Sequence, residues 1–469
     1  MRECCQRSIH KGASEIPARQ AALRILARVD VDRAFVDKML DPWLRRVPPH
    51  DRSFVREIVL GTTMWRGRID WTLERFAERP LTTLTPWIRN ILRMGVYQIL
   101  FLDRIPDRAA IDESVKLAHT FGHRGVAGFV NAVLRKIAAE RGQIAYPAQG
   151  TDPVEAIAIH YSHPAWMVRR WIDRYGVQET EMICQANNQR PVLTVRVNRL
   201  KTTVTGLQER LRREGGIETE VIEEFGDFLA VPEPKELFNT EAFKEGWFIV
   251  QDPSAGIPVL LLDPQPGETI LDMCSAPGGK ASSMAILTGD QARIIAVEKH
   301  PGRVVVLQEN LDRLGLSGVK VLCGDALTLP FIKDSPEQLP STTVDGNRFF
   351  EKVLVDVPCS GTGTLSKKSD ARWHRSEEQI HDMVELQGRL LETAARFVKP
   401  GGVIVYSTCS IEREENEGVV EAFLRCYPTY RPESVPPSFR RWGQTMIKTF
   451  RHRDGIDGSF CVRLTNVER

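Results

Sequence analysis

Short apolar stretches alternate with helical stretches over the second half of the chain, and this alternation restricts the fold more than any other feature. Strands are expected in TILDMC, ARIIAVEK, VKVLCGDA, KVLVDVPC, GGVIVYSTC and SFCVRLTN. These runs are apolar on both faces, which indicates strands buried on both sides in a mostly parallel sheet covered by helices. The predicted class is α/β, and ligands of such a sheet bind beyond the carboxyl ends of its strands.

Further segments precede this sheet, because 469 residues are too many for one hydrophobic core. Residues 17–140 repeat apolar positions every three or four residues, with prolines between the repeats, which predicts an all-α bundle. Residues 161–250 mix helical and alternating patterns and predict a small α+β unit. We expect residues 1–16 to be disordered, 141–160 to form a linker with Gly and Pro, and 251–469 to form the α/β domain.

Charge is distributed unevenly along the chain. Residues 1–150 contain 25 Lys and Arg against 16 Asp and Glu, a balance of +9, whereas the other 319 residues contain 38 against 45, a balance of −7. A basic domain joined to a near-neutral one suggests contact with a polyanion such as nucleic acid. Arg-rich solvated helix faces are the alternative explanation, and the charge pattern alone does not separate the two.

The chain contains no run of eighteen or more apolar residues, and its N-terminus lacks the apolar core of a signal peptide. We therefore expect a cytoplasmic protein that does not span a membrane. Nine cysteines, an odd number spread over a long chain, do not indicate a disulfide framework, so we expect reduced thiols.

The first expected strand ends in a loop that contains glycine, LDMCSAPGGKAS, at residues 271–282. The strand ends at Asp272, and Pro277, Gly278 and Gly279 then open a helix. Backbone N–H groups can approach a ligand closely at such a helix N-terminus. The loop is neither the dinucleotide fingerprint G-x-G-x-x-G nor a P-loop, which disfavours dinucleotides and triphosphates.

Acidic residues also end the next two strands. Glu298, 26 residues beyond Asp272, is placed to accept hydrogen bonds from both ribose hydroxyls of a nucleoside. Asp325 is placed to contact an exocyclic amine of a base. A strand-end carboxylate taken alone is more often just solvated, but three such strand ends without a phosphate-binding motif favour S-adenosylmethionine as the cofactor.

The last two candidates are thiols: Cys359, which follows Pro358, and Cys409, which stands between Thr408 and Ser410. A free cysteine is usually a small buried hydrophobic residue, but these two end strands at the ligand edge. A metal site is disfavoured because neither has a C-x-x-C or Cys/His cluster. A thiolate beside a methyl donor can add to carbon 6 of cytosine and make carbon 5 nucleophilic. A helix N-terminus after Cys409 is expected to lower its pKa, and the second thiol has a use in releasing the product.

These stretches also carry a resemblance. DMCSAPGGK, DVPCSGTGTL and YSTCSIEREENE, together with NRLKTT and VQDPSAG, resemble the RNA (cytosine-5-)methyltransferases of the Sun and RsmB branch, which act on bacterial 16S ribosomal RNA. AIDESVKLAHTFGHRGVAGFVNAVLRKI is similar to the NusB-like domain of that branch. The resemblance implies a Rossmann-like S-adenosylmethionine-dependent methyltransferase domain, preceded by an all-α NusB-like bundle and a small α+β unit that both bind RNA.

The resemblance implies roles for individual residues as well. Cys409 is the expected nucleophile, Cys359 helps release the product, and Asp356 is a catalytic residue beside the target base. Arg303 is expected near the cofactor, and spacing alone does not tell which thiol attacks. The expected cofactor-binding residues are Cys274, Ser275, Ala276, Pro277, Gly278, Gly279, Lys280, Glu298, Asp325 and Asp356.

We therefore expect an enzyme that methylates carbon 5 of one cytidine in 16S ribosomal RNA through a covalent bond between cysteine and carbon 6. A transfer RNA substrate is one alternative. An RNA-binding ribosome assembly factor without activity is another, although the intact pair of thiols argues against it. We expect RNA as the partner, no metal, no membrane and a monomeric state.

Overall fold

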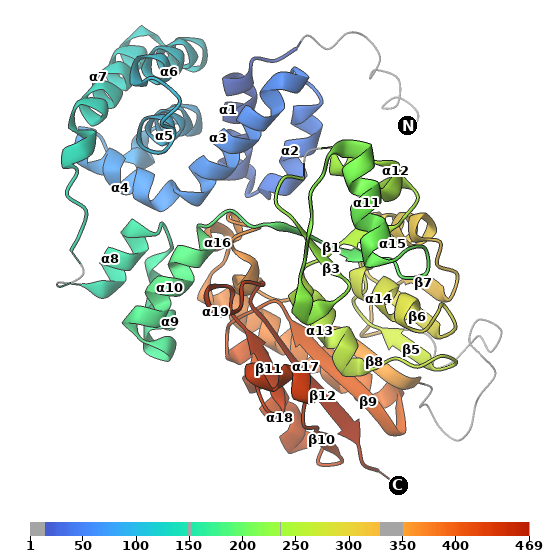
Figure 1. The fold of residues 1–469 in the computed structure, drawn as a ribbon. Coiled ribbons are helices and arrows are strands. Elements are labelled where there is room, and N and C mark those ends of the chain that lie inside the picture. The colour runs from blue at the N-terminus through green and yellow to red at the C-terminus, as the bar shows by residue number, and fades with distance from the viewer. Residues whose placement is uncertain (1–14, 149, 151, 235, 329–349, 469) are drawn as a thin grey trace, which may run out of the picture. The chain divides into compact units, whose positions relative to one another are not determined.

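The structure is a computed structural model, and it describes residues 15–148, 150, 152–234, 236–328 and 350–468 (Figure 1). The described chain divides into two compact units. The first unit contains the described residues up to Gln189 together with Lys368–His374, and the second contains the described residues of Arg190–Lys367 and Arg375–Arg469. The segment 1–16, expected to be disordered, lies outside the described residues except for its last two positions.

The first unit is helical, as the three- and four-residue spacing predicts. Apolar positions along α1 to α7 share one core, which includes Leu23, Ile58, Ile91 and Leu134. The helices are α1 (Ala18–Asp32), α2 (Val36–Leu44), α3 (Arg52–Met64), α4 (Arg66–Phe76), α5 (Pro86–Phe101), α6 (Asp107–Phe121), α7 (Arg124–Glu140), α8 (Pro153–His160), α9 (Ala165–Tyr175), α10 (Val177–Asn187) and α16 (Ala371–His374), with the 3₁₀ turns η1 (Pro49–Asp51), η2 (Leu81–Thr83) and η3 (Arg141–Gln143).

The stretch 141–160, expected to be a linker, contains the start of α8. Asp152 caps this helix, because its carboxylate accepts hydrogen bonds from Val154 N at 2.9 Å and Glu155 N at 3.2 Å. Pro153 occupies the first turn, where a backbone N–H is not needed. The proline in this stretch therefore marks a helix start, and α8, α9 and α10 belong to the first compact unit rather than with the small sheet.

One short piece of later sequence, Lys368–His374, also belongs to the first unit. The guanidinium of Arg372 is fully buried there and donates hydrogen bonds to Ser162 O at 3.1 Å and to Asn188 Oδ1 at 2.8 Å. The indole of Trp373 donates to Thr63 O at 2.7 Å. Burial lowers the pKa of Arg372 to about 10. These contacts hold the segment within the helical unit, although its neighbours in sequence belong to the other unit.

Residues 193–250 form the small α+β part of the second unit; the sequence predicted such a part over residues 161–250. The sheet is antiparallel with the order β2-β3-β1-β4. Arg196 of β1 donates hydrogen bonds to Gly279 O at 3.3 Å and Ser282 Oγ at 3.1 Å, which ties this sheet to the larger domain of the same unit. The elements are β1 (Leu193–Val197), α11 (Val204–Gly215), β2 (Glu220–Val221), η4 (Glu223–Phe225), β3 (Phe228–Val231), η5 (Leu237–Asn239), α12 (Glu241–Lys244) and β4 (Phe248–Val250).

A larger sheet forms the rest of the second unit, with the order β10-β12-β9-β8-β5-β6-β7 and β11 paired to β12. The neighbours from β7 to β9 are parallel, and β12 runs antiparallel to β9. The strands are β5 (Thr269–Asp272), β6 (Arg293–Glu298), β7 (Val319–Cys323), β8 (Phe350–Asp356), β9 (Val398–Thr408), β10 (Tyr430–Pro432), β11 (Met446–Thr449) and β12 (Ser459–Asn466). The prediction of a mostly parallel α/β sheet is confirmed.

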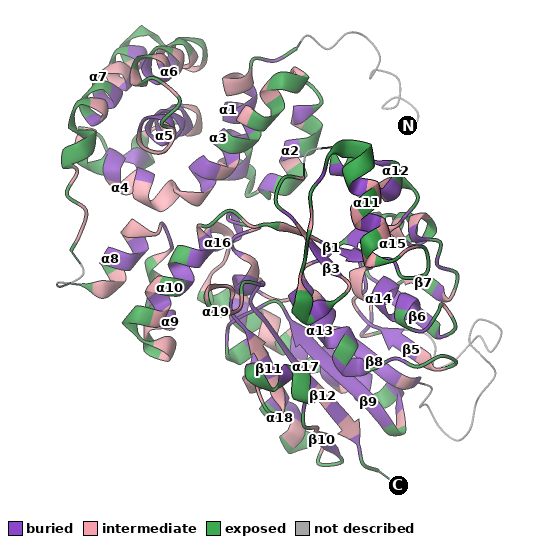
Figure 2. Ribbon diagram, viewed as in Figure 1, coloured by how far each residue is buried: buried purple, intermediate pink, exposed green. Residues whose placement is uncertain are grey.

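Helices cover both faces of this sheet. Ile270 and Ile294 pack in one core with α13, α14 and α15, whereas their neighbours Leu271 and Ile295 pack in a second core with α17 and α18. Figure 2 shows the buried colour along β8 and β9. The helices and turns are α13 (Pro253–Leu262), α14 (Gly279–Leu287), α15 (Pro301–Leu314), η7 (Thr362–Thr364), α17 (Glu377–Phe397), the π-helical turn η8 (Glu414–Gly418), α18 (Val419–Cys426), η9 (Pro437–Trp442) and α19 (Arg451–Asp454).

A buried ion-pair group stabilises the helical unit. Arg93 of α5 donates to both carboxylate oxygens of Asp70 at 2.7 Å and lies 3.3 Å from Asp30 Oδ1.

Replacing Arg93 with Ala leaves two partly buried carboxylates without this partner, and we expect the free energy of unfolding to fall by about 3–5 kcal/mol. Urea unfolding of the variant measures the loss. Lys116→Ala is the control, since its pair with Glu113 is exposed and is expected to contribute little to stability. Equal losses for both variants would contradict the prediction.

Candidate active site

The loop after β5 packs so closely against α15 that it requires glycine at one position. Gly278 has φ 99°, and a Cβ atom built there would lie 2.6 Å from Leu307 Cδ1. Ser275 N donates to Val297 O at 2.8 Å, so the loop also bonds to the end of the neighbouring strand β6. The loop then enters α14 at Gly279. The residues from Cys274 to Lys280 therefore line the carboxyl end of the central parallel strand, as expected.

Glu298 and Asp325 lie at the ends of the next two strands, as the sequence indicates. Glu298 is buried, and its carboxylate accepts a hydrogen bond from His300 N at 2.9 Å and pairs with Arg303 at 3.1 Å. Asp325 pairs with Lys299 at 2.8 Å. That hydrogen bond, with a second from the backbone of Leu327, lowers the pKa of Asp325. The Glu298 and Asp325 carboxylates are therefore held by cationic side chains and backbone N–H groups at the carboxyl ends of the parallel strands.

Asp356 ends β8 and accepts two hydrogen bonds. Lys280 Nζ lies 2.7 Å from its Oδ2, and Ser407 Oγ donates to its Oδ1 at 2.7 Å. Burial disfavours the charged ammonium of Lys280, but the Asp356 carboxylate outweighs it and raises the Lys280 pKa, with a smaller contribution from a Cys409 thiolate. Lys280 is therefore a fixed positive charge that acts on both Asp356 and Cys409.

The two thiols singled out in the sequence lie side by side. Asp356 is opposite Ser407 in the β8–β9 register, so the residues that follow each strand leave the sheet together. The Sγ atoms of Cys359 and Cys409 are 3.2 Å apart, and neither cysteine forms a disulfide. The hydrogen bond with Cys409 and then burial raise the pKa of Cys359 well above its usual value. The Cys359 thiol is therefore harder to ionise than an isolated cysteine.

The loop that follows Cys359 is held tightly by backbone contacts and buried charges. Gly363 N donates to Cys409 O at 3.0 Å, and a Cβ atom at Gly363 would lie 2.0 Å from Gly458 O. Lys367 pairs with Asp457 at 2.7 Å and also with Asp252. Burial disfavours the Lys367 ammonium, but these two carboxylates outweigh it and raise its pKa.

Sequence reasoning missed the polar group beneath the thiols. Ser360, Ser410 and Glu415 are buried and hydrogen-bonded to one another, and Gln387 bonds to the same carboxylate. A signal was present in the sequence, because each thiol is followed directly by serine in DVPCSG and STCSI. Glu415 stands in the acidic run IEREENE, which indicated only a helix start.

Asp272 is a further buried carboxylate at the site. Neither of its oxygens has a hydrogen-bond partner within the part of the chain that the structure describes, and the same holds for Ser275 Oγ. Burial raises the pKa of Asp272 to about 7, and the nearby negative charge of Asp356 adds to this effect. Polar atoms left free at the end of β5 are therefore available to a ligand.

Two absences complete the description of the chain. In the described ranges, no group of three or more His, Cys, Asp and Glu side chains could hold a metal ion. The described helices also include none that is long and apolar enough to cross a membrane.

The fold and the site together define a class. A parallel sheet in this order, with a glycine loop opening a helix after its central strand and acidic residues ending the next strands, is a Rossmann-like methyltransferase domain. Family models match it and the segments before it: "16S rRNA methyltransferase RsmB/F" at residues 259–465, "NusB family" at 16–139, and the RsmF/B-like ferredoxin-like domain at 163–236.

Curated relatives match nearly the whole chain. The Bacillus subtilis (strain 168) protein "Probable ribosomal RNA small subunit methyltransferase B" is 34% identical over 461 residues, which cover 95% of this chain and 98% of that protein. The ribosomal RNA small subunit methyltransferase B of Yersinia pseudotuberculosis (serotype O:1b, strain IP 31758) is 32% identical over 87% of this chain and 90% of its own. The chain therefore belongs to the family of ribosomal RNA small subunit methyltransferase B, whose members methylate 16S ribosomal RNA.

Solved structures agree with this family. The crystal structure of PH0851 is 28% identical, with a TM-score of 0.79, and the match covers 96% of this chain and 99% of that one. A methyltransferase homolog from Pyrococcus horikoshii is 27% identical, with a TM-score of 0.57, over 67% of this chain and 99% of that one. The family expected from the sequence motifs is confirmed.

The raised pKa of Asp272 makes stability depend on pH. A carboxyl whose pKa rises on folding binds more protons in the folded than in the unfolded state between about pH 4 and 7. The protonated Asp272 carboxyl therefore makes its full contribution to folding stability below about pH 4, and this contribution is lost as pH rises through about 7. Asp272→Asn should flatten this decline, which is on the order of a few kcal/mol. Urea unfolding of both proteins from pH 4 to 8 measures it, and an unchanged decline in the variant would contradict the assignment.

Proposed function

We propose that this chain methylates carbon 5 of one cytidine in 16S ribosomal RNA, with S-adenosylmethionine as the methyl donor and Cys409 as a covalent nucleophile. The observation that carries the proposal is the pair of thiols, 3.2 Å apart and not joined in a disulfide, at the edge where parallel strands of a methyltransferase sheet end. An assembly factor without activity would have no use for two thiols in contact at that edge.

The loop after β5 and the neighbouring strand ends fit S-adenosylmethionine. Gly278 lets the loop backbone pack directly against Leu307, where a Cβ atom would clash, and Ser275 Oγ has no partner among the described residues, as hydrogen bonding to an amino-acid group requires. Glu298 would hold the ribose and Asp325 the adenine edge. Arg303 supports this region, because it donates to Ala276 O at 2.5 Å and pairs with Glu298. When bound, the cofactor supplies an electrophilic methyl group to carbon 5 of the activated ring.

Cys409 is placed to attack the base. Its side chain is exposed, whereas Cys359 is only partly exposed. The Lys280 ammonium and the Cys359 thiol both favour the thiolate form of Cys409. The thiolate sulfur forms a bond to carbon 6, and the electron pair of the C5–C6 double bond moves to make carbon 5 nucleophilic. Asp356, held by Lys280 and Ser407, would accept a hydrogen bond from the exocyclic amine of the same base.

Cys359 acts after methyl transfer. Once the Cys409 sulfur is bonded to carbon 6, it loses the negative charge and the strong hydrogen bond with Cys359 that is the main reason for the raised Cys359 pKa. The Cys359 thiol can then lose its proton to solvent, and the resulting thiolate accepts the proton from carbon 5. The electron pair of that C–H bond restores the C5–C6 double bond, and the S–C6 bond breaks to return the Cys409 thiolate.

The remaining domains are assigned to RNA binding. The first 150 residues carry an excess of nine positive charges, which suits a phosphate backbone. Residues 17–140 and 161–250 would bind the RNA, and the target base must leave its stack to reach Cys409. A ribosomal RNA substrate also implies a cytoplasmic enzyme. The affinity for RNA is expected to fall as salt rises.

The substrate assignment is tested by transfer of a labelled methyl group. Protein, labelled S-adenosylmethionine and bare 16S RNA should yield 5-methylcytidine at one position, detected by nucleoside analysis and bisulfite sequencing. Transfer RNA is the parallel substrate. Label in transfer RNA but not in 16S RNA would overturn the substrate, and no label in either would support the inactive assembly factor.

The thiol roles are tested by two single substitutions. Cys409→Ala removes the nucleophile, so no methyl transfer and no protein–RNA adduct are expected. Cys359→Ala keeps the nucleophile but removes the base needed for release, so a covalent adduct should accumulate and migrate slowly on a denaturing gel. The opposite pattern would exchange the two roles, and an active Cys409→Ala enzyme would end the covalent mechanism.

A further inference from the structure

A buried carboxylate bridges the two loops that carry the thiols. Glu415 lies in the π-helical turn η8, and its side chain is fully buried. It accepts hydrogen bonds from Ser360 N at 2.7 Å and from the hydroxyls of Ser360 and Ser410. Ser360 directly follows Cys359, and Ser410 directly follows Cys409. One carboxylate therefore bonds to the neighbour of each thiol.

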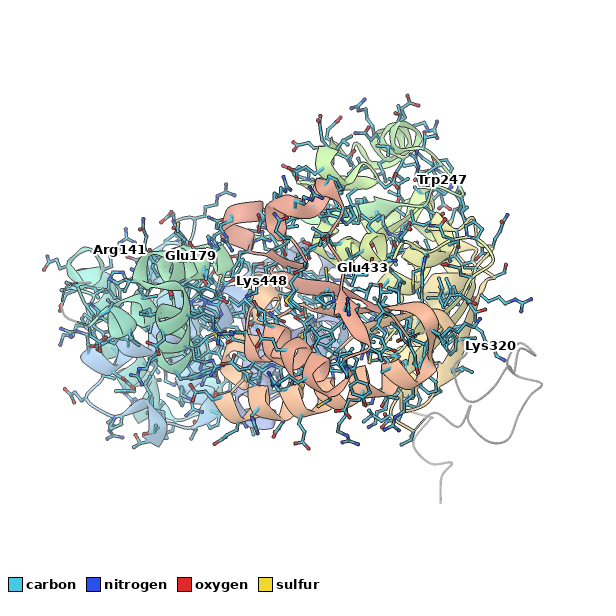
Figure 3. All side chains as sticks on the ribbon, turned by 90° about the horizontal axis from the view of Figure 1, so that it is seen from below. Arg141, Glu179, Trp247, Lys320, Glu433 and Lys448 are labelled. Carbon is cyan, nitrogen blue, oxygen red and sulfur yellow. The ribbon has the colours of Figure 1, made fainter. Side chains whose placement is uncertain are left out.

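Surrounding groups hold this carboxylate in place. Gln387 of α17 donates to Glu415 Oε1 at 3.0 Å and also to Pro358 O at 2.9 Å. Tyr406 of β9 donates to the backbone oxygen of Glu415 at 2.5 Å. Lys448 of β11, labelled in Figure 3, forms an ion pair with Glu417 in the same turn. The turn is thus attached to three elements of the domain, and the carboxylate has little freedom to move.

A charge this deeply buried is retained only if it is well bonded. Burying a carboxylate costs several kcal/mol unless hydrogen bonds compensate, and two serines and a glutamine provide them here. The two serine hydroxyls that bond Glu415 also lie 3.1 Å from each other, so the three side chains form one hydrogen-bonded group. The carboxylate therefore holds the Cys359 and Cys409 loops at one fixed separation.

We infer that Glu415 is a positioning residue for both thiols, and that it couples adduct formation at Cys409 to product release at Cys359. The inference rests on the proposed function for the roles of the two thiols. Glu415 touches neither sulfur through a hydrogen bond of its own, so it acts through Ser360 and Ser410. Its negative charge also contributes, after Cys409 and burial, to the raised pKa of Cys359.

The test compares Glu415→Gln with a matched control, Asn416→Ala. Asn416 is equally buried, but its side chain accepts from Thr408 Oγ1 at 2.6 Å and donates to Ser410 O at 2.9 Å, so it supports only the Cys409 loop. In a Cys359→Ala background, both substitutions should slow the appearance of the RNA adduct in a single turnover. In the native background, only Glu415→Gln should also slow release and make the adduct accumulate.

The expected effect of Glu415→Gln is a loss of about 100-fold in kcat, since misplacing a reacting group by about 1 Å has that size of effect. KM for RNA and for S-adenosylmethionine should stay unchanged, because Glu415 is proposed to bind neither. A native kcat with native adduct kinetics would overturn the inference. A parallel rise in both KM values would reduce Glu415 to a general structural residue.

Alkylation of Cys359 gives a second measurement that does not depend on catalysis. Removing the Glu415 charge should lower the Cys359 pKa, so its reaction with iodoacetamide, followed by peptide mass spectrometry in a Cys409→Ser background, should begin at lower pH in Glu415→Gln. An unshifted profile would overturn the inference. If Cys359→Ala with native Glu415 forms no adduct, the proposed function fails on its own, and the alkylation result still decides whether Glu415 acts on Cys359.

Should Glu415→Gln not fold, as judged by its circular dichroism, two milder variants replace it. Ser410→Ala detaches the Cys409 loop and should slow adduct formation. Ser360→Ala removes the hydroxyl that bonds the Cys359 loop to Glu415, and it should slow release. Identical kinetics for these two variants would contradict separate attachment of the two loops.

Discussion

The parallel pairing of β8 with β9 is the constraint on which the site depends. Its register places Asp356 opposite Ser407, so both strands end at the same level of the sheet. Cys359 and Cys409, fifty positions apart in sequence, then leave neighbouring strand ends and come within 3.2 Å. A shift of the register by one residue would turn every side chain of β9 to the opposite face and separate the two sulfurs.

Electrostatics gives these two thiols different properties although they are chemically identical. Cys409 lies near the Lys280 ammonium and is exposed, whereas Cys359 lies beside Cys409 and near the buried Glu415. A positive neighbour favours a thiolate, and a negative neighbour together with burial favours a thiol. Under the proposed function, this difference in environment suits one thiol to be the nucleophile and the other to hold a proton.

Patterns in the sequence located the strands and the residues at their ends well, because local periodicity and strand ends decide these features. Sequence patterns did not reveal contacts between residues that lie far apart along the chain. The acidic run after Cys409 indicated a helix N-terminus, but the helical turn begins only at Glu414, and Glu415 points into the protein as a bonded carboxylate. The segment Lys368–His374 follows the Cys359 loop, yet Arg372 is buried among Ser162 and Asn188 of the helical unit. No local pattern distinguishes such an arginine from a solvated one.

The sequence by itself determined the α/β class, the helical and small α+β segments before it, the family, and the residues that end the parallel strands. It did so because strand periodicity, glycine and proline positions, and the residue types at strand ends are local properties. Only the tertiary structure decided that the two thiols touch, that Lys280 and Ser407 both bond Asp356, and that Glu415 joins the two cysteine loops. Those contacts depend on strand order, register and burial, which bring together residues whose separation along the chain carries no information about their separation in space.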